Sequence, residues 1–165
     1  MLLRDELLIS KDLKPGQEIM LAILLTREYV ARLSDERLFR PAGITDQQFN
    51  VLRILKGGPA EGYLVREIRR RMISRNADVP RLVERMVRSG LVRRREDPHD
   101  RRCCLVQLSS DGMACEARLA PVHDQLCREV DAVLKECEGG TLLALLQRFR
   151  EGIGAKLATL VEASD

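Results

Sequence analysis

The sequence predicts a mainly helical protein with one small β-hairpin, and three observations lead to this fold class. Apolar residues make up 45% of the chain and aromatic residues only 3%, and low aromatic content with much Leu, Arg, Glu and Ala is typical of helical proteins. Apolar residues recur at helical spacing along most of the chain, and one pair of short stretches has the pattern of strands. The length of 165 residues corresponds to one domain, or to one domain with dimerising arms.

The first predicted helix runs from about Lys14 to Leu33. Its centre, Ile19–Leu25, is apolar on every side, which indicates burial on more than one face. In so small a domain, a partner subunit is the easiest source of the second face. Pro41 and Gly43 are then expected to break the chain.

A second helix is predicted to begin at Thr45, because Thr45-Asp46-Gln47-Gln48 has the pattern of a capping box. Gly57-Gly58-Pro59 ends it. A short helix follows over Leu64–Met72, with Leu64, Ile68 and Met72 on one face.

The next helix is predicted to start between Asn76 and Asp78 and to end at Ser89, where Gly90 fits a left-handed stop. Pro80 supports this start, since proline is tolerated only in the first helical turn. One face forms an apolar stripe of Val79, Leu82, Val83, Met86 and Val87. The opposite face carries Arg81, Arg85 and Arg88.

Two strands, Leu91–Arg95 and Cys103–Leu108, are predicted around the turn at residues 97–100. Ser109 then fits the cap of a long helix that extends to about Cys137. Glu138-Gly139-Gly140 is expected to be a break, and the last helix covers Thr141 to about Val161. Its apolar side consists of Leu142, Leu145, Leu146, Phe149, Ile153, Leu157 and Leu160.

Positive charge is concentrated in one part of the chain. The net charge is +3, but residues 66–102 hold 13 Arg, no Lys and six acids, a local net charge of +7 that leaves −4 for the rest. A basic block on an acidic scaffold is the electrostatic pattern of a nucleic-acid-binding face, with a solvated Arg-rich surface as the alternative. The few aromatic residues disfavour single strands and RNA, whose binding depends on base stacking.

The order of the elements predicts a winged helix-turn-helix, in which one helix lies in the major groove and the hairpin reaches an adjacent groove. Three segments resemble MarR-type transcriptional regulators: residues 44–52, residues 80–94 and, most specifically, the hairpin. The hairpin motif is Asp97-Pro98-His99-Asp100-Arg101-Arg102, followed by Val106-Gln107-Leu108-Ser109. The resemblance covers about residues 14–161.

The resemblance implies a mainly α fold with a small β wing, in which dimerisation helices flank a winged helix-turn-helix lobe. The chain would then consist of an N-terminal dimerisation helix (1–40), a DNA-binding lobe (41–109) and C-terminal dimerisation helices (110–165). It also implies a homodimer that binds a palindromic operator in double-stranded DNA, as a repressor that a small-molecule effector releases. A two-fold dimer would set the half-sites roughly 10 bp apart.

Candidate DNA contacts lie in the helix that starts near Asp78 and just before it. Ser74, Arg75 and Asn76 have short polar side chains or backbone amides that suit phosphate or base-edge contact, and Asn76 fits an N-cap equally well. Arg81 and Arg85 lie on the outward face, and Arg is the usual bidentate reader of guanine. The alternative for both is an ordinary solvated helix face.

The hairpin adds Arg94, Arg101 and Arg102 to the candidate DNA contacts. One of Arg101 and Arg102 is expected to enter the minor groove. The other is expected to pair with Asp97 or Asp100, which hold the shape of the wing on either interpretation.

An effector pocket is expected between the dimerising helices and the DNA-binding lobe. Its candidate walls are Met20, Leu24 and Arg27 of the first helix and Phe49 of the second. Each of these residues is equally well explained as part of the core.

The sequence carries no catalytic pattern, such as a Gly-rich phosphate loop or a nucleophile elbow, so we expect neither an enzyme nor a cofactor. The odd number of cysteines and the acidic start of the chain favour a cytoplasmic protein without a targeting or membrane segment. His123 and Cys127 have metal-ligand spacing, but no further ligand is apparent and no metal is expected. The alternatives are a redox- or metal-responsive regulator and a winged-helix module that binds an acidic protein.

Overall fold

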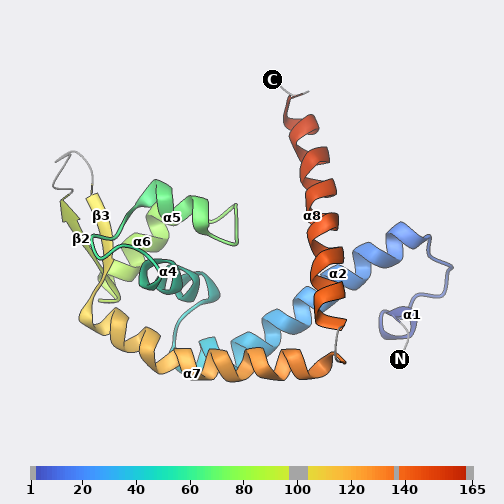
Figure 1. Ribbon diagram of the computed structural model, residues 1–165, viewed down its shortest axis with the longest axis horizontal. Helices are drawn as coiled ribbons and strands as arrows, with labels where there is room; N and C mark the ends of the chain where they lie inside the picture. Colours follow the sequence, from blue (N-terminus) through green and yellow to red (C-terminus); the bar gives the residue numbers. More distant parts are fainter. Residues whose placement is uncertain (1–2, 97–103, 136–137, 163–165) are drawn as a thin grey trace. The chain divides into compact units, whose positions relative to one another are not determined.

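The computed structural model describes residues 3–96, 104–135 and 138–162, without the side chains of residues 161 and 162. The chain divides into two compact units, Met1–His123 and Asp124–Asp165. The first unit holds every element up to the first half of α7 (Ser110–Val133), and the second holds the rest of α7 and α8 (Glu138–Glu162), as labelled in Figure 1. No helix of the described segments is long and apolar enough to cross a membrane.

The N-terminal part of the chain is almost entirely helical. A single turn, α1 (Leu3–Glu6), precedes α2 (Pro15–Ser34), whose bounds confirm the first predicted helix. Pro15 begins α2, where its missing N–H leaves no helical bond unmade. None of the residues of α2 is buried in the single chain, and its apolar centre is only partly covered, with Leu21, Ala22, Ile23 and Leu25 half-buried.

The break expected at Pro41 is not found there. The chain continues from α2 through a π-helical turn, η1 (Asp35–Phe39), into α3 (Arg40–Ala42). Pro41 lies in the first turn of α3, where proline is tolerated because no helical hydrogen bond needs its nitrogen. The helix ends at Gly43, whose φ of 67° is left-handed.

Helix α4 (Asp46–Lys56) begins with the predicted capping box. The backbone N–H of Gln48 donates to Thr45 Oγ1 at 3.2 Å, and the backbone N–H of Thr45 donates to Gln48 Oε1 at 2.9 Å. The helix presents Phe49, Val51, Leu52 and Leu55 to the interior, all of them buried. The local pattern in the sequence therefore determined both the start and the orientation of this helix.

The segment after α4 contains a strand that the sequence analysis missed. Tyr63 and Leu64 form β1 (Tyr63–Leu64), and α5 (Val65–Arg71) starts only after them, so the prediction of a helix from Leu64 was wrong. The strand pairs antiparallel with Val106 and Leu105. A two-residue strand has no recognisable period, and the hydrogen bonds that create it come from a distant segment.

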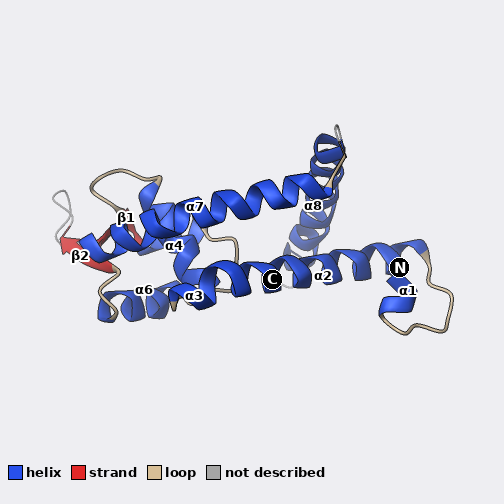
Figure 2. Ribbon diagram, turned by 90° about the horizontal axis from the view of Figure 1, so that it is seen from below, coloured by secondary structure: helices blue, strands red, loops and turns tan. Residues whose placement is uncertain are grey.

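The sheet has three strands in the order β1-β3-β2. Strands β2 (Val92–Glu96) and β3 (Cys104–Leu108) form the predicted hairpin, and their register runs from Val92 opposite Leu108 to Glu96 opposite Cys104. Figure 2 shows the sheet at one edge of the lobe, beside α4, α6 (Val79–Arg88) and the start of α7. Val92 and Val106 are buried and belong to the hydrophobic core that α4, α5 and α6 share with the sheet.

The last two helices differ from their predicted bounds. Ser109 caps α7 as expected, since its Oγ accepts from the backbone N–H of Gly112 at 2.9 Å. Helix α7 ends at Val133 and not near Cys137, and α8 begins at Glu138, so the predicted break at Gly139-Gly140 was wrong. The Glu138 carboxylate accepts from the backbone N–H of Lys135 at 2.8 Å, which stabilises an earlier start, and glycine is tolerated in a first turn.

Candidate DNA-binding interface

Helix α6 is the element whose outward face the sequence analysis assigned to the major groove. Its N-cap is Asp78, whose Oδ1 accepts from the backbone N–H of Arg81 at 3.2 Å, and Pro80 lies in the first turn as predicted. Gly90 follows its C-terminus with a φ of 74°. The N–H groups of Gly90 and Leu91 bond back to the carbonyls of Val87 and Met86, which is a Schellman motif.

The two faces of α6 are sharply different. Val79, Leu82, Val83 and Met86 are all at most 1% exposed and anchor the helix in the core. The opposite face, by helical spacing, carries the exposed residues Arg81, Glu84, Arg85 and Arg88. The buried stripe therefore holds three guanidinium groups on one outward surface.

These arginines are not equally available to a ligand. Arg81 Nε lies 3.3 Å from Asp78 Oδ2, so the N-cap residue and not Glu84 is its neighbour. Arg85 and Arg88 make no ion pair or hydrogen bond with another residue of the described segments. A DNA contact by Arg81 would compete with the Asp78 pair, whereas Arg85 has no such competitor there.

The segment before α6 is exposed at Ser74, Arg75 and Asn76. Asn76 is not the N-cap, so its alternative explanation as a cap was wrong; Asp78 takes that position because its carboxylate reaches the Arg81 N–H. Arg75 donates from Nη1 to the backbone carbonyl of Arg70 at 2.8 Å, which ties this segment to the end of α5.

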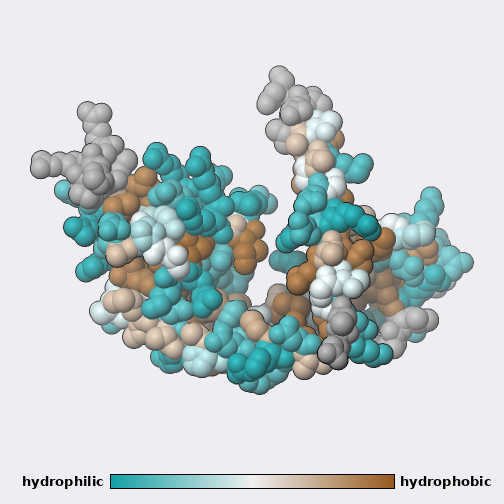
Figure 3. Space-filling model, viewed as in Figure 1, coloured by the Kyte–Doolittle hydropathy of each residue, from teal (hydrophilic) through white to brown (hydrophobic). Residues whose placement is uncertain are grey.

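Helix α5 contributes further positive charge beside this segment. Arg66, Arg69 and Arg70 are exposed on it, and hydrophilic side chains gather over α5 in the space-filling view (Figure 3). Arg71 is held differently, because its guanidinium lies 4.1 Å from the centre of the Tyr63 ring and donates to the Glu67 carbonyl. Arg71 is thus part of the packing between β1 and α5.

The hairpin places Arg93, Arg94 and Arg95 on consecutive, exposed positions of β2. The predicted contact Arg94 lies opposite Val106 on β3. Arg93 lies opposite Gln107, and its Nε donates to Gln107 Oε1 at 3.3 Å. The sequence pattern did not predict this pair, because a turn centred on residues 97–100 would place Arg93 opposite Cys104, whereas the observed register is centred on residue 100.

The tip of the wing lies outside the described residues. This applies to the predicted DNA contacts Arg101 and Arg102 and to the predicted wing residues Asp97 and Asp100.

Two comparisons relate this winged-helix lobe to known proteins. The MarR family model matches residues 42–102, from the end of α3 through the wing. The chain is similar to a mutant MarR from E. coli complexed with operator DNA, at 29% identity and a TM-score of 0.69, over 78% of this chain and 90% of that one.

The winged-helix lobe belongs to the MarR family.

Other solved structures share this MarR fold. A putative MarR-like transcription regulator from Bacillus cereus is 21% identical, with a TM-score of 0.72 over 83% of this chain and 96% of that one. The PcaV transcriptional regulator from Streptomyces coelicolor, in complex with its natural ligand, is 19% identical, with a TM-score of 0.69 over 86% and 97%. No curated protein matches the chain.

The comparisons confirm the family and the winged-helix fold class that the sequence predicted. The chain has the fold of MarR-type DNA-binding transcriptional regulators. Because members of the MarR family are transcriptional regulators and not enzymes, the prediction that the chain is not an enzyme is confirmed as well.

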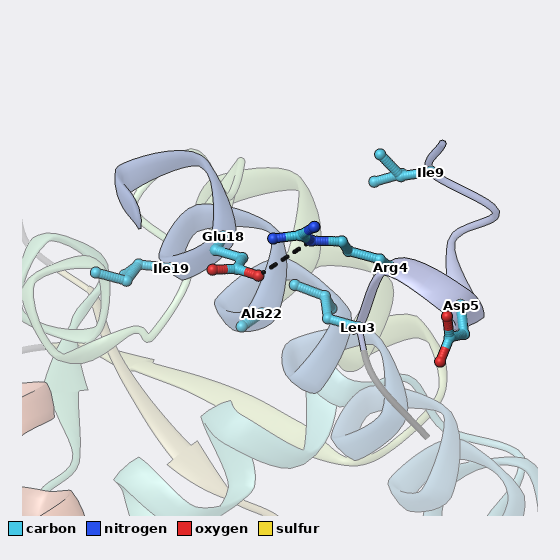
Figure 4. A pocket seen from close by; sticks show the side chains of 7 residues that line it. All are labelled: Leu3, Arg4, Asp5, Ile9, Glu18, Ile19 and Ala22. Carbon is cyan, nitrogen blue, oxygen red and sulfur yellow. Dashed lines mark ion pairs between the residues drawn. The ribbon is translucent and has the colours of Figure 1, made fainter. Parts of the chain in front are cut away.

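The four residues proposed to line an effector pocket differ in their burial within the single subunit. Phe49 is buried in the core, where its ring lies 5.6 Å from that of Phe39 and 5.5 Å from that of His123. Met20 and Leu24 are 61% and 58% exposed, and Arg27 is exposed on α2. A cavity of about 720 Å³ lies nearer the N-terminus, where Arg4 forms an ion pair with Glu18 at 3.5 Å (Figure 4). Its lining consists of Leu3, Arg4, Asp5, Ile9, Glu18, Ile19 and Ala22.

His123 and the cysteines were the residues considered for metal or redox chemistry. His123 is half-buried, and its ring packs against that of Phe49. Within the described segments, no three His, Cys, Asp or Glu side chains come together as a metal site requires. Cys104 is exposed on β3, Cys115 is buried, and no disulfide joins the described cysteines.

Proposed function

We propose that this chain is a homodimeric repressor that binds a palindromic operator in duplex DNA and is released by a small-molecule effector. The observation that carries the proposal is the outward face of α6, where Arg81, Arg85 and Arg88 are held by a fully buried stripe on the same helix. A rigid helix that presents several guanidinium groups suits the acceptor-rich edge of guanine in the major groove.

The charge distribution supports DNA as the partner. Residues 66–102 carry +7 and the remaining residues −4, so a polyanion would meet this lobe and be repelled by the rest. Ser74, Arg75, Asn76 and Arg94 would add contacts at the edges of the same face, with Arg101 and Arg102 at the wing. The E. coli MarR structure with operator DNA supports the same use of a related lobe.

Unpaired apolar surface supports the homodimer. On α2, Ile19, Met20, Leu24, Val30 and Leu33 are between 39% and 61% exposed. Helix α8 exposes a longer apolar series, part of which is visible as hydrophobic side chains on its surface in Figure 3: Leu142, Leu145, Leu146, Phe149, Ile153, Leu157 and Leu160. Surfaces of this size on a soluble chain are typical of subunit interfaces. We therefore assign residues 1–40 and 110–165 to dimer contacts and residues 41–109 to DNA binding.

Release by a small-molecule effector is a separate part of the proposal. It rests on the family and on the PcaV structure of the same fold, which holds its natural ligand. In this chain, Met20, Leu24 and Arg27 of α2 are the proposed contacts, because they are exposed in the single subunit. Phe49 would act by packing beneath such a pocket.

The experiment is a fluorescence anisotropy titration of labelled, mixed-sequence duplex at several salt concentrations. Binding should be strong at low salt and fall linearly on a log–log plot, because each neutralised phosphate releases counterions, with a slope of about −0.9 per phosphate. No retention of the duplex at low salt would overturn the proposal. Arg81→Ala and Arg102→Ala should each weaken binding, and indifference at both positions would overturn the site.

The alternative function, a winged-helix module that binds an acidic protein, gives a different result in the same titration. An acidic polypeptide such as poly-Glu would compete for the arginine face, and mixed-sequence duplex would be bound no better than this polymer. A clear preference for duplex over poly-Glu at equal charge supports the regulator.

A further inference from the structure

A buried glutamine lies behind the arginines of the wing strand. Gln107 on β3 is only 6% exposed, and it stands directly opposite Arg93 on β2. Buried side-chain amides need partners for both their donor and their acceptor, because an unmade hydrogen bond is costly away from water. The partners of Gln107 therefore decide how it is oriented.

The Gln107 amide has only one possible orientation. Its Nε2 donates to the backbone carbonyl of Ala60 at 2.8 Å, and a carbonyl can only accept. Oε1 is thereby directed at the wing strand, where it accepts from Arg93 Nε at 3.3 Å. The loop that contains Ala60 thus determines that the Gln107 oxygen, and not its nitrogen, lies next to Arg93.

The loop itself is pressed against β3. Gly62 has a φ of 87°, and a Cβ at this position would lie 2.1 Å from the Val106 carbonyl oxygen and 2.8 Å from Gln107 Cγ. Only glycine permits this approach. The loop, Gln107 and Arg93 therefore form one connected series of contacts from the end of α4 to the wing.

The bond through Nε leaves the end of the Arg93 guanidinium available. Arg93 makes no other hydrogen bond or ion pair with the described residues, so its two terminal nitrogens can donate outward. Arg94, Arg95 and Gln107 line a cavity of about 340 Å³ with it. A guanidinium held at Nε and open at both terminal nitrogens is suited to bidentate binding of a phosphate.

We propose that Arg93 binds a backbone phosphate of the DNA beside the wing, and that Gln107 is a positioning residue that orients the guanidinium for it. The site lies on β2, which ends at Glu96. A phosphate contact adds affinity and register but no sequence preference. The inference rests on the proposed DNA binding. It adds Arg93 as a contact to the DNA backbone, and not to the bases, and Gln107 as the residue that positions Arg93.

The first test is the salt dependence of duplex binding by Arg93→Ala. Affinity should fall several-fold for every duplex sequence, and the magnitude of the log–log salt slope should decrease by about 1 for each bound subunit. The matched control is Arg148→Ala, which removes the same charge from an exposed position on α8, opposite the apolar series proposed for the dimer, and should leave the slope unchanged. An unchanged slope for Arg93→Ala would overturn the proposal.

The second test separates positioning from structural support. Gln107→Met keeps the volume but loses both hydrogen bonds of the amide. It should weaken duplex binding several-fold in the wild-type background and have no further effect in the Arg93→Ala background. Additive losses would show that Gln107 acts on the lobe and not through Arg93.

A third variant covers the case in which Gln107→Met does not fold, as judged by circular dichroism. Arg93→Lys keeps the charge but has no planar fork and no Nε–H, so affinity should fall while the salt slope remains close to that of the wild type. Full affinity in Arg93→Lys would overturn the role of the Gln107 bond. If the wild-type protein does not bind duplex, the proposed function fails. If the wild type binds duplex and the Arg93 and Gln107 variants bind it with the same affinity and salt slope, only this inference fails.

Discussion

Arg53 on α4 donates from Nη1 to Oε1 of Glu116 on α7, at 3.2 Å. The Glu116 side chain is 4% exposed and that of Arg53 is 45% exposed, so the carboxylate is buried while the guanidinium still reaches water. The pair joins the capped helix α4 to the helix that leaves the lobe. A buried carboxylate depends on such a partner, because its desolvation must be offset by direct hydrogen bonds.

We expect Arg53→Ala to lower the free energy of unfolding by about 2 kcal/mol, because it leaves the Glu116 carboxylate buried and unpaired. Urea unfolding at a constant protein concentration measures the loss. Arg66→Ala, an exposed arginine on α5, is the matched control and should change stability by less than about 0.5 kcal/mol. Equal stability of Arg53→Ala and the wild type would contradict a stabilising role of the pair.

Gly112→Ala is expected to destabilise the protein by at least about 2 kcal/mol, although alanine is the better helix former by about 1 kcal/mol. The reason is steric, since a Cβ on Gly112 would lie 1.9 Å from the Leu91 carbonyl oxygen, which is backbone and cannot move away.

Gly152→Ala on α8 is the control for this effect, because nothing lies within 4 Å of its Cβ position. It should raise helical stability by up to about 1 kcal/mol. Thermal unfolding followed by circular dichroism should therefore shift in opposite directions for the two variants, and a shift in the same direction would argue against the close approach of α7 to Leu91.

Arg85→Ala is expected to lower affinity for the preferred operator about tenfold or more, since a bidentate contact to guanine contributes about 1–3 kcal/mol. Arg88→Ala removes the same charge from the last turn of α6 and should cause a smaller loss that is equal for all duplex sequences. Anisotropy titrations with operator and with mixed-sequence duplex measure both. Identical behaviour of the two variants would remove Arg85 from the base-reading residues.

Ile153→Glu is expected to dissociate the proposed dimer and to weaken operator binding in parallel, because it places a charge in the exposed apolar series of α8, where Ile153 is 42% exposed. Sedimentation velocity gives the oligomeric state. Ala155→Glu introduces the same charge away from the apolar side and should leave the dimer intact. A dimer that survives Ile153→Glu would move the interface to another surface.

Elements defined by neighbours in the chain were predicted well. The capping box at Thr45 and the apolar stripe of α6 depend on residues three or four apart. Both are as predicted, except that Val87 at the end of the stripe is 38% exposed. The N-cap of α6 was placed less well, because Asn76 and Asp78 are both good caps and only the fold selects the one whose carboxylate reaches the Arg81 N–H.

Contacts between distant segments were not predictable in the same way. The strand Tyr63–Leu64 exists because β3 pairs with it from about forty residues away, and two residues carry no period of their own. The same holds for the bond from Gln107 to the Ala60 carbonyl, which needs the left-handed Gly62 beside it.

The sequence by itself determined the helical periods, the caps and a basic segment of +7 within a chain of +3. These follow from hydrogen bonds and side-chain spacing over one or two turns, which need no other part of the molecule. Only the tertiary structure decided which arginines have a partner from a distant segment: Arg53 pairs with Glu116, and Arg93 is held through one nitrogen by Gln107. These pairings depend on burial and on sheet register, both of which arise when distant segments pack together.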